Sequence, residues 1–485
     1  MTSPLHPVLV GASELANHNA DAEPIAMMVE AAQAALAEIP AIRSAITEVA
    51  VVKGINPYND PGSLIATQLG LRNATTTYTP VGGNAPYDLL NDTAARIAGG
   101  EIGAALVCGA ETMRTRRKDH AAGRKTAYLD EAADAAPDRV VGADTPLTDA
   151  ADDAAGVNMP VHFYAMAESA LRHQRGEAID SHLDRISALW AEASAVAATN
   201  PHARIGESID AHNIATNGPT NRRIAAPYTK LLTSNVDVDQ ASALVLCSYE
   251  TAQAAGIDDE AMVYLLAGTG ASDVLRIRSR LDLARSNAAR IAGQRALELA
   301  GLTIDEIDHL DLYSCFPVAV QVVRRELGVS PDRPFTITGG MTFAGGPFNT
   351  YCLQAAAHAF ELLAGTDEFA LMHGNGGYFS KESFVIASGS PPANDFAYER
   401  PQADVDAHPE RPPTEEIPSE GTIEAYTVTF DRNDQPVHAI LSILDGFGSR
   451  HWVIDDDPAD VSRLLDTDAV GWRVSIDDEG AARIV

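Results

Sequence analysis

Short apolar runs alternate with segments of helical spacing along the first hundred residues. Residues 8–12, 49–53 and 104–109 are apolar and have the length of strands. Residues 24–38 and 85–98 lie between these runs and place their apolar residues, many of them alanine, at helical intervals. This alternation predicts a layered α/β fold with a partly parallel, buried sheet.

The same pattern returns in the second part of the chain at a nearly constant distance. Residues 31–36 resemble residues 292–297, and the predicted strand 49–52 resembles 310–313, both at an offset of 261. Gly82-Gly83 corresponds to Gly345-Gly346 at an offset of 263, and 107–109 corresponds to 372–374 at 265. Four landmarks in one order, with a slowly growing offset, indicate an internal duplication.

Segments outside the repeat define the remaining organisation. We expect a first half at 1–110 plus 226–270, a second half at 271–389, and an inserted loop domain at 111–225 with a helix near 186–199. Residues 390–420 are rich in proline and acidic residues, which is typical of a linker. Residues 421–485 alternate short apolar runs with turns, which predicts a small β domain, with an OB-like barrel as one candidate.

Composition narrows the classes of partner. The net charge is −32, with 67 acidic and 35 basic residues, which argues against nucleic acid because phosphate binding needs concentrated lysine and arginine. No apolar stretch is long enough to cross a membrane, and no secretory signal is visible. The four cysteines have no CxxC spacing, which argues against a zinc site and a disulfide framework. We expect a cytoplasmic protein without metal or permanently bound cofactor.

Four segments in order carry a resemblance to the thiolase superfamily. They are 97–113, Tyr313-Ser314-Cys315-Phe316, the glycine-rich stretch 339–347, and 371–377. The second segment resembles the His-Asp-Cys-Phe segment of sterol-carrier-type thiolases. The pattern is most similar to actinobacterial thiolase-like proteins with an additional C-terminal domain. The resemblance implies a duplicated five-layer αβαβα fold with a loop-domain insertion, and an acyltransferase family that acts on acyl-CoA in lipid metabolism.

The chain departs from the family pattern where thiolase chemistry takes place. By the resemblance, the nucleophilic cysteine falls at Gly83 and its activating histidine at Gly346. The family's second cysteine falls near His373, and the Asn or His that helps to hold the thioester oxygen falls at Tyr313. Glycine has no side chain, so no acyl-enzyme can form at position 83 and ordinary thiolase activity is expected to be absent.

Tyr313 and His373 are then the candidate catalytic residues in a cavity floored by Gly83 and Gly346. A histidine titrates near neutrality, and a phenol can donate a hydrogen bond to an oxyanion. Both residues are equally compatible with a packing role in the core. Cys315 is a weaker candidate, because most free cysteines are buried small residues.

A basic cluster interrupts the general acidity at the start of the insertion. Since arginine and lysine are the usual partners of phosphate groups, this cluster is a candidate site for CoA; a solvated loop is the alternative. The family's CoA-contacting loop falls at Ser234-Asn235. The cluster consists of Arg114, Arg116, Arg117, Lys118, Arg124 and Lys125.

Three functions remain open at this point. The first is a protein that binds acyl-CoA-type ligands on a thiolase scaffold with little or no catalysis. The second is a retro-aldol lyase that cleaves a β-hydroxyacyl-CoA with Tyr313 as base and the C-terminal β domain as a fused partner. The third is a non-catalytic assembly subunit. The acyl group is not determined by the sequence, and both a homodimer and a monomer are compatible with it.

Overall fold

The computed structural model describes residues 2–18, 21–414, 416, 418–477 and 482–485. The described chain forms two sheets. One is a mixed sheet of 11 strands in the order β10-β11-β12-β9-β1-β8-β4-β2-β3-β5, with β13 paired beside β9. The other has seven strands and lies mainly in the C-terminal region. The predicted α/β class is confirmed.

The first half supplies strands β1 to β4 and β8 with their helices. Its elements are β1 (Pro7–Ala16), α1 (Pro24–Leu36), η1 (Pro40–Ala45), β2 (Ile46–Val51), α2 (Pro61–Leu69), β3 (Thr75–Tyr78), α3 (Ala85–Ala98), β4 (Ala104–Thr112), β8 (Asp239–Ser248), α9 (Tyr249–Ala254) and η3 (Asp259–Ala261).

The second half supplies strands β9 to β12. Its elements are β9 (Val263–Ser272), η4 (Ile277–Ser279), α10 (Asn287–Ala300), η5 (Ile304–Glu306), β10 (His309–Asp311), α11 (Pro317–Leu327), α12 (Gly340–Phe343), η6 (Phe348–Thr350), α13 (Tyr351–Leu363), β11 (Phe369–Gly376) and β12 (Lys381–Ser388). Because β9 pairs along its length with β12, the second half begins before residue 271.

Strand pairing shows the duplication directly. In the first half β2 is parallel to β4, and β4 and β1 are antiparallel to β8. In the second half β10 is parallel to β11, and β11 and β9 are antiparallel to β12. The register agrees with the sequence offsets, because Ala50 pairs with Val107 and Asp311 pairs with Met372.

An equivalent hydrogen bond joins the outer helix to the sheet in each half. The Ser13 hydroxyl donates to the Ala31 carbonyl at 2.7 Å, and the Thr269 hydroxyl donates to the Ala292 carbonyl at 2.8 Å. Ala31 and Ala292 belong to the two segments whose sequences resemble each other. The repeat predicted from the sequence is therefore also a repeat of side-chain contacts.

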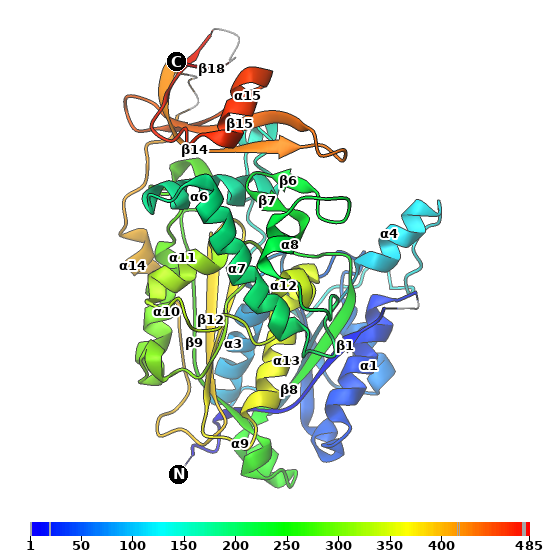
Figure 1. Ribbon diagram of the computed structural model, residues 1–485. Helices are drawn as coiled ribbons and strands as arrows, with labels where there is room; N and C mark the ends of the chain where they lie inside the picture. Colours follow the sequence, from blue (N-terminus) through cyan, green and yellow to red (C-terminus); the bar gives the residue numbers. More distant parts are fainter. Residues whose placement is uncertain (1, 19–20, 415, 417, 478–481) are drawn as a thin grey trace.

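Helices α3 and α13 form the central layer. They contact each other, α3 contacts strands of both halves, and α13 contacts β1, β8 and β11 (Figure 1). Helix α1 covers the outer face of the first half and α10 that of the second, which completes the five layers. The counterpart of β3 in the second half is residue Phe335 and its neighbours. The Phe335 carbonyl accepts from the Leu312 N–H at 2.8 Å, although the segment around Phe335 is not itself a strand.

Most of the regular secondary structure in the insertion between β4 and β8 is helical. Its strand β5 extends the sheet beyond β3 in parallel, so the edge of the first half is covered by the insertion. The predicted helix near 186–199 is the second part of α7. The elements are α4 (Met113–Ala121), β5 (Arg139–Val140), α5 (Ala150–Ala154), α6 (Pro160–Gln174), α7 (Ile179–Ala197), α8 (Ala211–Ala215), β6 (Arg223–Ala225), β7 (Tyr228–Thr229) and η2 (Lys230–Leu232).

The C-terminal region contributes five antiparallel strands to the second sheet, with a helix between the third and the fourth. These are β14 (Glu420–Phe430), β15 (Pro436–Leu444), β16 (Arg450–Asp455), α15 (Pro458–Asp466), β17 (Arg473–Ile476) and β18 (Ala482–Ile484). Strand β14 pairs with β15 and β17, and β16 contacts β18. This arrangement suits the expected OB-like, partly open barrel.

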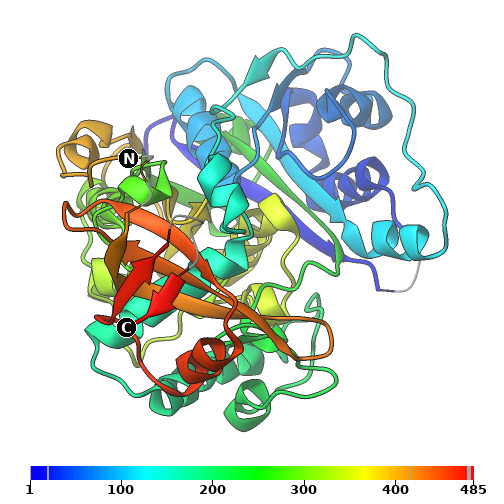
Figure 2. The same cartoon turned by 90° about the horizontal axis from the view of Figure 1, so that it is seen from above.

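The insertion and the C-terminal strands share one sheet. Ala225 of β6 pairs with Thr429 of β14, and Arg223 forms a double ion pair with Asp434 while its guanidinium lies 4.2 Å from the ring centre of Phe430. Figure 2 shows the C-terminal strands, in orange and red, over the insertion and the second half, away from the first half in blue.

The segment predicted to be a linker packs on the core in part. It includes β13 (Ala397–Glu399), which pairs in parallel with β9, and α14 (Gln402–Asp406), which contacts α10. Residues 415 and 417 of this segment, and 478–481 of the predicted β domain, lie outside the described residues. Over the described ranges, no helix is both long and apolar enough to span a membrane.

Candidate functional site

The two glycines at the positions of the lost family groups lie near the starts of α3 and α13. Gly83 directly precedes Asn84, the N-cap residue of α3, and Gly346 lies five residues before α13, with η6 between them. The Asn349 side-chain oxygen in η6 accepts from the Gly82 N–H at 3.1 Å. The duplication therefore brings both helix starts to one place at the centre of the molecule.

The Tyr313 phenol fills the place of a side chain at position 83. A Cβ added to Gly83 would overlap the Tyr313 hydroxyl and the backbone oxygen of Asn375. Tyr313 follows β10, which ends at Asp311, and its ring packs edge-on against Tyr351 of α13. The residue that the resemblance aligns with the oxyanion group therefore occupies the space beside Gly83.

Ser234 fills the corresponding place at position 346. A Cβ on Gly346 would collide with the Ser234 hydroxyl oxygen, which is buried and has no hydrogen-bond partner among the described residues. The backbone holds Ser234 there, because its N–H donates to the Cys315 carbonyl at 3.0 Å and the Gly346 N–H donates to the Asn235 carbonyl at 2.8 Å. Ser234 and Asn235 thus line the site.

The protonation of Tyr313 follows from its burial. Only 7% of the residue is exposed, and burial raises the pKa of its hydroxyl well above 10, with the nearby thiols of Cys315 and Cys352 adding to the shift. The phenol is therefore neutral at physiological pH. It can donate a hydrogen bond, but it is a poor base.

His373 lies on the opposite face of β11. Its neighbour Gly374 faces the inner layer, where an added Cβ would approach Tyr87 and Cys352, and successive residues of a strand point to opposite faces. The His373 Nε2 lies 2.7 Å from the Glu382 carboxylate, and its Nδ1 accepts the Tyr313 N–H at 3.3 Å. The expectation that His373 and the Tyr313 ring point into one cavity is therefore wrong for His373.

The four cysteines are buried and carry thiols rather than thiolates. Burial raises the pKa of Cys108, Cys247 and Cys315 to about 12 and raises that of Cys352 well above 9. The Cys352 thiol donates to the Gly83 carbonyl at 3.1 Å. A thiol in this state is a weak nucleophile.

An aromatic wall from the insertion closes the site on the side of α6. The Tyr164 ring stacks on Phe316 with ring centres 4.6 Å apart, and the Asn375 amide lies 3.1 Å from the Tyr164 hydroxyl. The Tyr378 hydroxyl donates to the Asn158 carbonyl at 2.7 Å. The insertion therefore contributes side chains to the site as well as covering it.

Two loops beside the glycines have strained backbones. Phe348 has φ of 48°, and Tyr378 and Phe379 both have φ of 62°, in the left-handed region that bulky residues rarely adopt. Each such residue costs about 1–3 kcal/mol and persists where its surroundings fix it. Such strain gathers at functional sites, which supports a role for this region.

The basic cluster lies on and after α4, which begins at the end of β4 and projects from the edge of the molecule (Figure 1). Most of its charges have partners. Arg114 pairs with Asp239 at 2.7 Å, Arg117 with Asp237 at 3.6 Å, Lys118 with Asp21 at 2.5 Å and Arg124 with Asp119 at 2.5 Å, and Arg116 donates to the Ile55 carbonyl at 2.6 Å. Arg117 and Lys118 are about half exposed.

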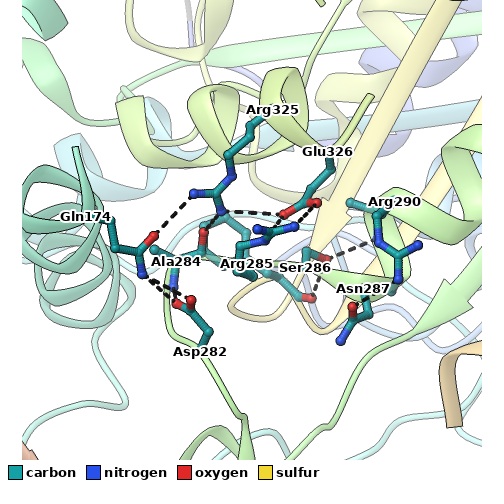
Figure 3. Close-up of polar contacts among 12 residues, drawn as sticks. Gln174, Asp282, Ala284, Arg285, Ser286, Asn287, Arg290, Arg325 and Glu326 are labelled. Atoms are coloured by element: carbon teal, nitrogen blue, oxygen red, sulfur yellow. Dashed lines mark hydrogen bonds and ion pairs between the residues drawn. The ribbon is translucent and has the colours of Figure 1, made fainter. Parts of the chain in front are cut away.

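A polar network fastens the end of α6 to the second half (Figure 3). The Gln174 amide donates to Asp282 and accepts from Arg325 of α11, while Arg285 and Arg325 both contact Glu326. A depression of about 250 Å³ lies beside it and is lined by residues including Asp282 and Arg285. These opposite charges neutralise one another, so the network holds α6 in place.

Sequence reasoning missed Asn84, Asn375 and Tyr164. Asn84 has the position of an ordinary helix cap. Asn375 lies inside a glycine-rich strand end, in which the glycines are the residues that carry the resemblance. Tyr164 belongs to the insertion, which has no counterpart in the repeat. Its place at the site depends on tertiary packing that no local spacing reports.

Comparison with known proteins places the chain among thiolase-like structures. Residues 401–481 match the thiolase-like protein type 1 additional C-terminal domain. The crystal structure of a monomeric SCP2-thiolase like protein type 1 from Mycobacterium smegmatis is 27% identical, and each chain covers 100% of the other with a TM-score of 0.85. The Ltp2-ChsH2(DUF35) aldolase is 17% identical, with a TM-score of 0.63 over 80% of this chain and 98% of that one, which shows the fold alone.

The curated relatives match only over part of their length. An acetyl-CoA acetyltransferase of Methanocaldococcus jannaschii is 29% identical over 105 residues, which are 22% of this chain and 26% of the relative. One of Methanothermobacter thermautotrophicus is 24% identical over 186 residues, 35% of this chain and 46% of the relative. The chain thus spans less than half of either relative.

Proposed function

Because the chain is a thiolase-like protein with the additional C-terminal domain of this family, we propose that it binds acyl-CoA-type ligands without forming a covalent acyl-enzyme. The observation that supports this most is the filling of both glycine positions. The Tyr313 hydroxyl stands where a side chain at 83 would be, and the Ser234 hydroxyl stands where one at 346 would be.

Neither replacement supplies a nucleophile. The Tyr313 hydroxyl stays protonated because burial raises its pKa, and the Ser234 hydroxyl has no base bonded to it among the described residues. A serine nucleophile needs an adjacent general base. The nearest thiol, that of Cys352, is protonated and bonded to the Gly83 carbonyl. These states support the absence of a covalent acyl-enzyme.

The CoA phosphates would meet the half-exposed cations of α4. Arg117 and Lys118 remain about half exposed despite their acidic partners, so a phosphate can compete with those carboxylates. Such contacts between exposed charges are screened over about 10 Å at 0.1 M salt. Affinity for CoA should therefore fall as salt is added.

The test uses the intact protein with acetyl-CoA and a longer acyl-CoA. Calorimetry should show binding, and mass spectrometry of the intact chain after incubation should show no added acyl group. An acyl group on Cys315, Cys352 or Ser234 would overturn the proposal. Absence of binding at low salt would overturn it as well.

A retro-aldol lyase acting on a β-hydroxyacyl-CoA is the second candidate. The fold it shares with the Ltp2-ChsH2(DUF35) aldolase and the neutral Tyr313 phenol favour it. In this reaction a base removes the hydroxyl proton, the Cα–Cβ bond breaks to give an aldehyde or ketone, and the enolate takes up a proton. Tyr313 suits the last step as the donor, and His373 cannot serve as the base from the other face of β11.

Tyr313→Phe separates the two candidates. For a lyase, loss of the proton donor lowers the release of aldehyde or ketone by a factor of about 10²–10⁴, while for a binding protein no product forms from either chain. Binding of acyl-CoA by the variant shows that it is folded. Equal release by wild type and variant would exclude Tyr313 as the donor.

A further inference from the structure

Asn84 holds its side chain in a way that is unusual for a helix cap. An asparagine at the N-cap normally uses its side-chain oxygen to accept an N–H of the first turn. In α3 no such bond forms, and Pro86 removes one of the N–H groups that could make it. Instead the Asn84 Nδ2 donates to the Asp88 carboxylate at 2.7 Å.

Asp88 fixes the direction of the Asn84 amide. Its carboxylate also accepts from the Ser383 hydroxyl and lies 3.3 Å from the Arg400 guanidinium. A carboxylate that is held by these donors can only accept from the asparagine amide. The Asn84 oxygen must therefore point away from Asp88.

The Asn84 oxygen points toward the candidate site without a partner. Asn84 is 5% exposed, and its Oδ1 is buried and makes no hydrogen bond among the described residues. A Cβ on Gly82 would lie 2.6 Å from this oxygen, and one on Gly376 would overlap it while approaching the Gly83 nitrogen at 3.4 Å. The oxygen thus lies in the glycine-lined space next to Gly83.

Three exposed apolar side chains lie in segments next to β3 and to the loop of Tyr378. Val81, Val140 and Met159 are 39%, 59% and 54% exposed. Hydrogen bonds connect the segments in which these side chains lie. The Val141 N–H donates to the Tyr78 carbonyl, and the Tyr378 hydroxyl donates to the carbonyl of Asn158, the residue before Met159. The surface formed by these segments is therefore partly apolar. Asn84 Oδ1 belongs, with the Ser234 hydroxyl oxygen and the Asn375 side-chain oxygen, to the buried groups near the glycines that have no partner among the described residues.

We propose that Asn84 accepts a hydrogen bond from a hydroxyl of the bound acyl group, so that the site prefers a β-hydroxyacyl thioester to the corresponding β-ketoacyl thioester. This rests on the proposed acyl-CoA binding. A buried acceptor costs free energy until a donor reaches it. A hydroxyl can donate and a ketone cannot, and the position next to Gly83 places the hydroxyl close to the thioester.

The experiment measures the affinity of wild type for three CoA thioesters with the same sixteen-carbon chain: 3-hydroxy, 3-oxo and saturated. We expect the 3-hydroxy thioester to bind about tenfold more tightly than the other two, the size of a hydrogen bond that satisfies a buried group. Asn84→Leu keeps the size of the side chain and removes the acceptor, so the three affinities should converge. Asn433→Leu, in the exposed turn after β14, serves as the matched control and should keep the preference.

Each result has one meaning. Equal binding of all three thioesters by wild type would overturn the role of Asn84 and leave the binding function intact. Absence of binding by all three would overturn the binding function itself. A preference that survives in a folded Asn84→Leu chain would assign the recognition of the hydroxyl to another group.

Discussion

The contact between Ser234 and position 346 predicts a strong coupling between two substitutions. Gly346→Ala adds a Cβ that collides with the Ser234 hydroxyl oxygen, far inside the ~3.5–4.0 Å at which atoms pack. Since the hydroxyl is buried, it must leave its rotamer or displace its neighbours. Off-rotamer strain and overpacking together predict a loss of about 1–3 kcal/mol.

Ser234→Ala removes the colliding atom. Without it, the added Cβ would have the Met341 carbonyl at 3.3 Å and the Ser234 Cβ at 3.4 Å as its nearest neighbours, which the site can accommodate by small shifts. Ser234→Ala alone should change stability little, because its hydroxyl oxygen has no partner to lose. The double variant should match wild type or exceed it slightly, because replacing glycine by alanine restricts the unfolded chain.

Thermal unfolding of wild type, both single variants and the double variant measures the coupling. We expect Gly346→Ala to unfold at a temperature lower by about 2–6 °C and the double variant to recover that loss. A neutral Gly346→Ala, or a double variant as unstable as the single one, would refute the argument that Ser234 fills this space.

Three further predictions concern other parts of the molecule. Arg450→Met removes the bonds of a buried guanidinium to Glu424 and to the carbonyls of Ile277 and Arg278, so it should cost about 3–5 kcal/mol, whereas Arg473→Met on the surface should change the melting temperature little. Burial raises the pKa of Glu111 from 4.5 to about 7, so its contribution to stability is present below pH 4.5 and is lost as the pH rises through 7; Glu111→Gln should flatten this part of a stability profile. Charge reversal of Arg117 and Lys118 together should weaken CoA binding and its salt dependence, and unchanged calorimetric affinity would contradict a role for α4.

The duplication could be predicted because its evidence is periodic in the sequence. The offset of 261 that relates Gln33 to Gln294 also relates Ala50 of β2 to Asp311 of β10, and it grows only to 265 between their partners Val107 and Met372. Helix α3 has the predicted bounds, Ala85–Ala98, because Pro86 and the apolar spacing both mark it.

The position of the candidate site could be predicted from the sequence, but the directions of its side chains and their contacts could not. The resemblance predicted the position of His373 along β11 but not the face of the sheet on which its side chain lies. Successive side chains of a strand point to opposite faces, so a shift of one residue in the alignment reverses the predicted direction. The joining of β6 to β14 was missed because Ala225 and Thr429 are far apart in sequence and β6, with three residues, is too short to give a pattern. The filling of Gly83 by Tyr313 is likewise a contact between distant residues.

The sheet shared by the insertion and the C-terminal strands also affects the order of events on the ribosome. About 195 residues separate Ala225 at the end of β6 from Glu420 at the start of β14. At about 5–20 residues per second, translation of this stretch takes roughly 10–40 s. During that time the β6–β7 hairpin and the face of α6 that contacts β14 have no cover. A nascent chain of this protein therefore presents an open strand edge for chaperones or for other nascent chains to bind, and that edge closes only when β14 emerges.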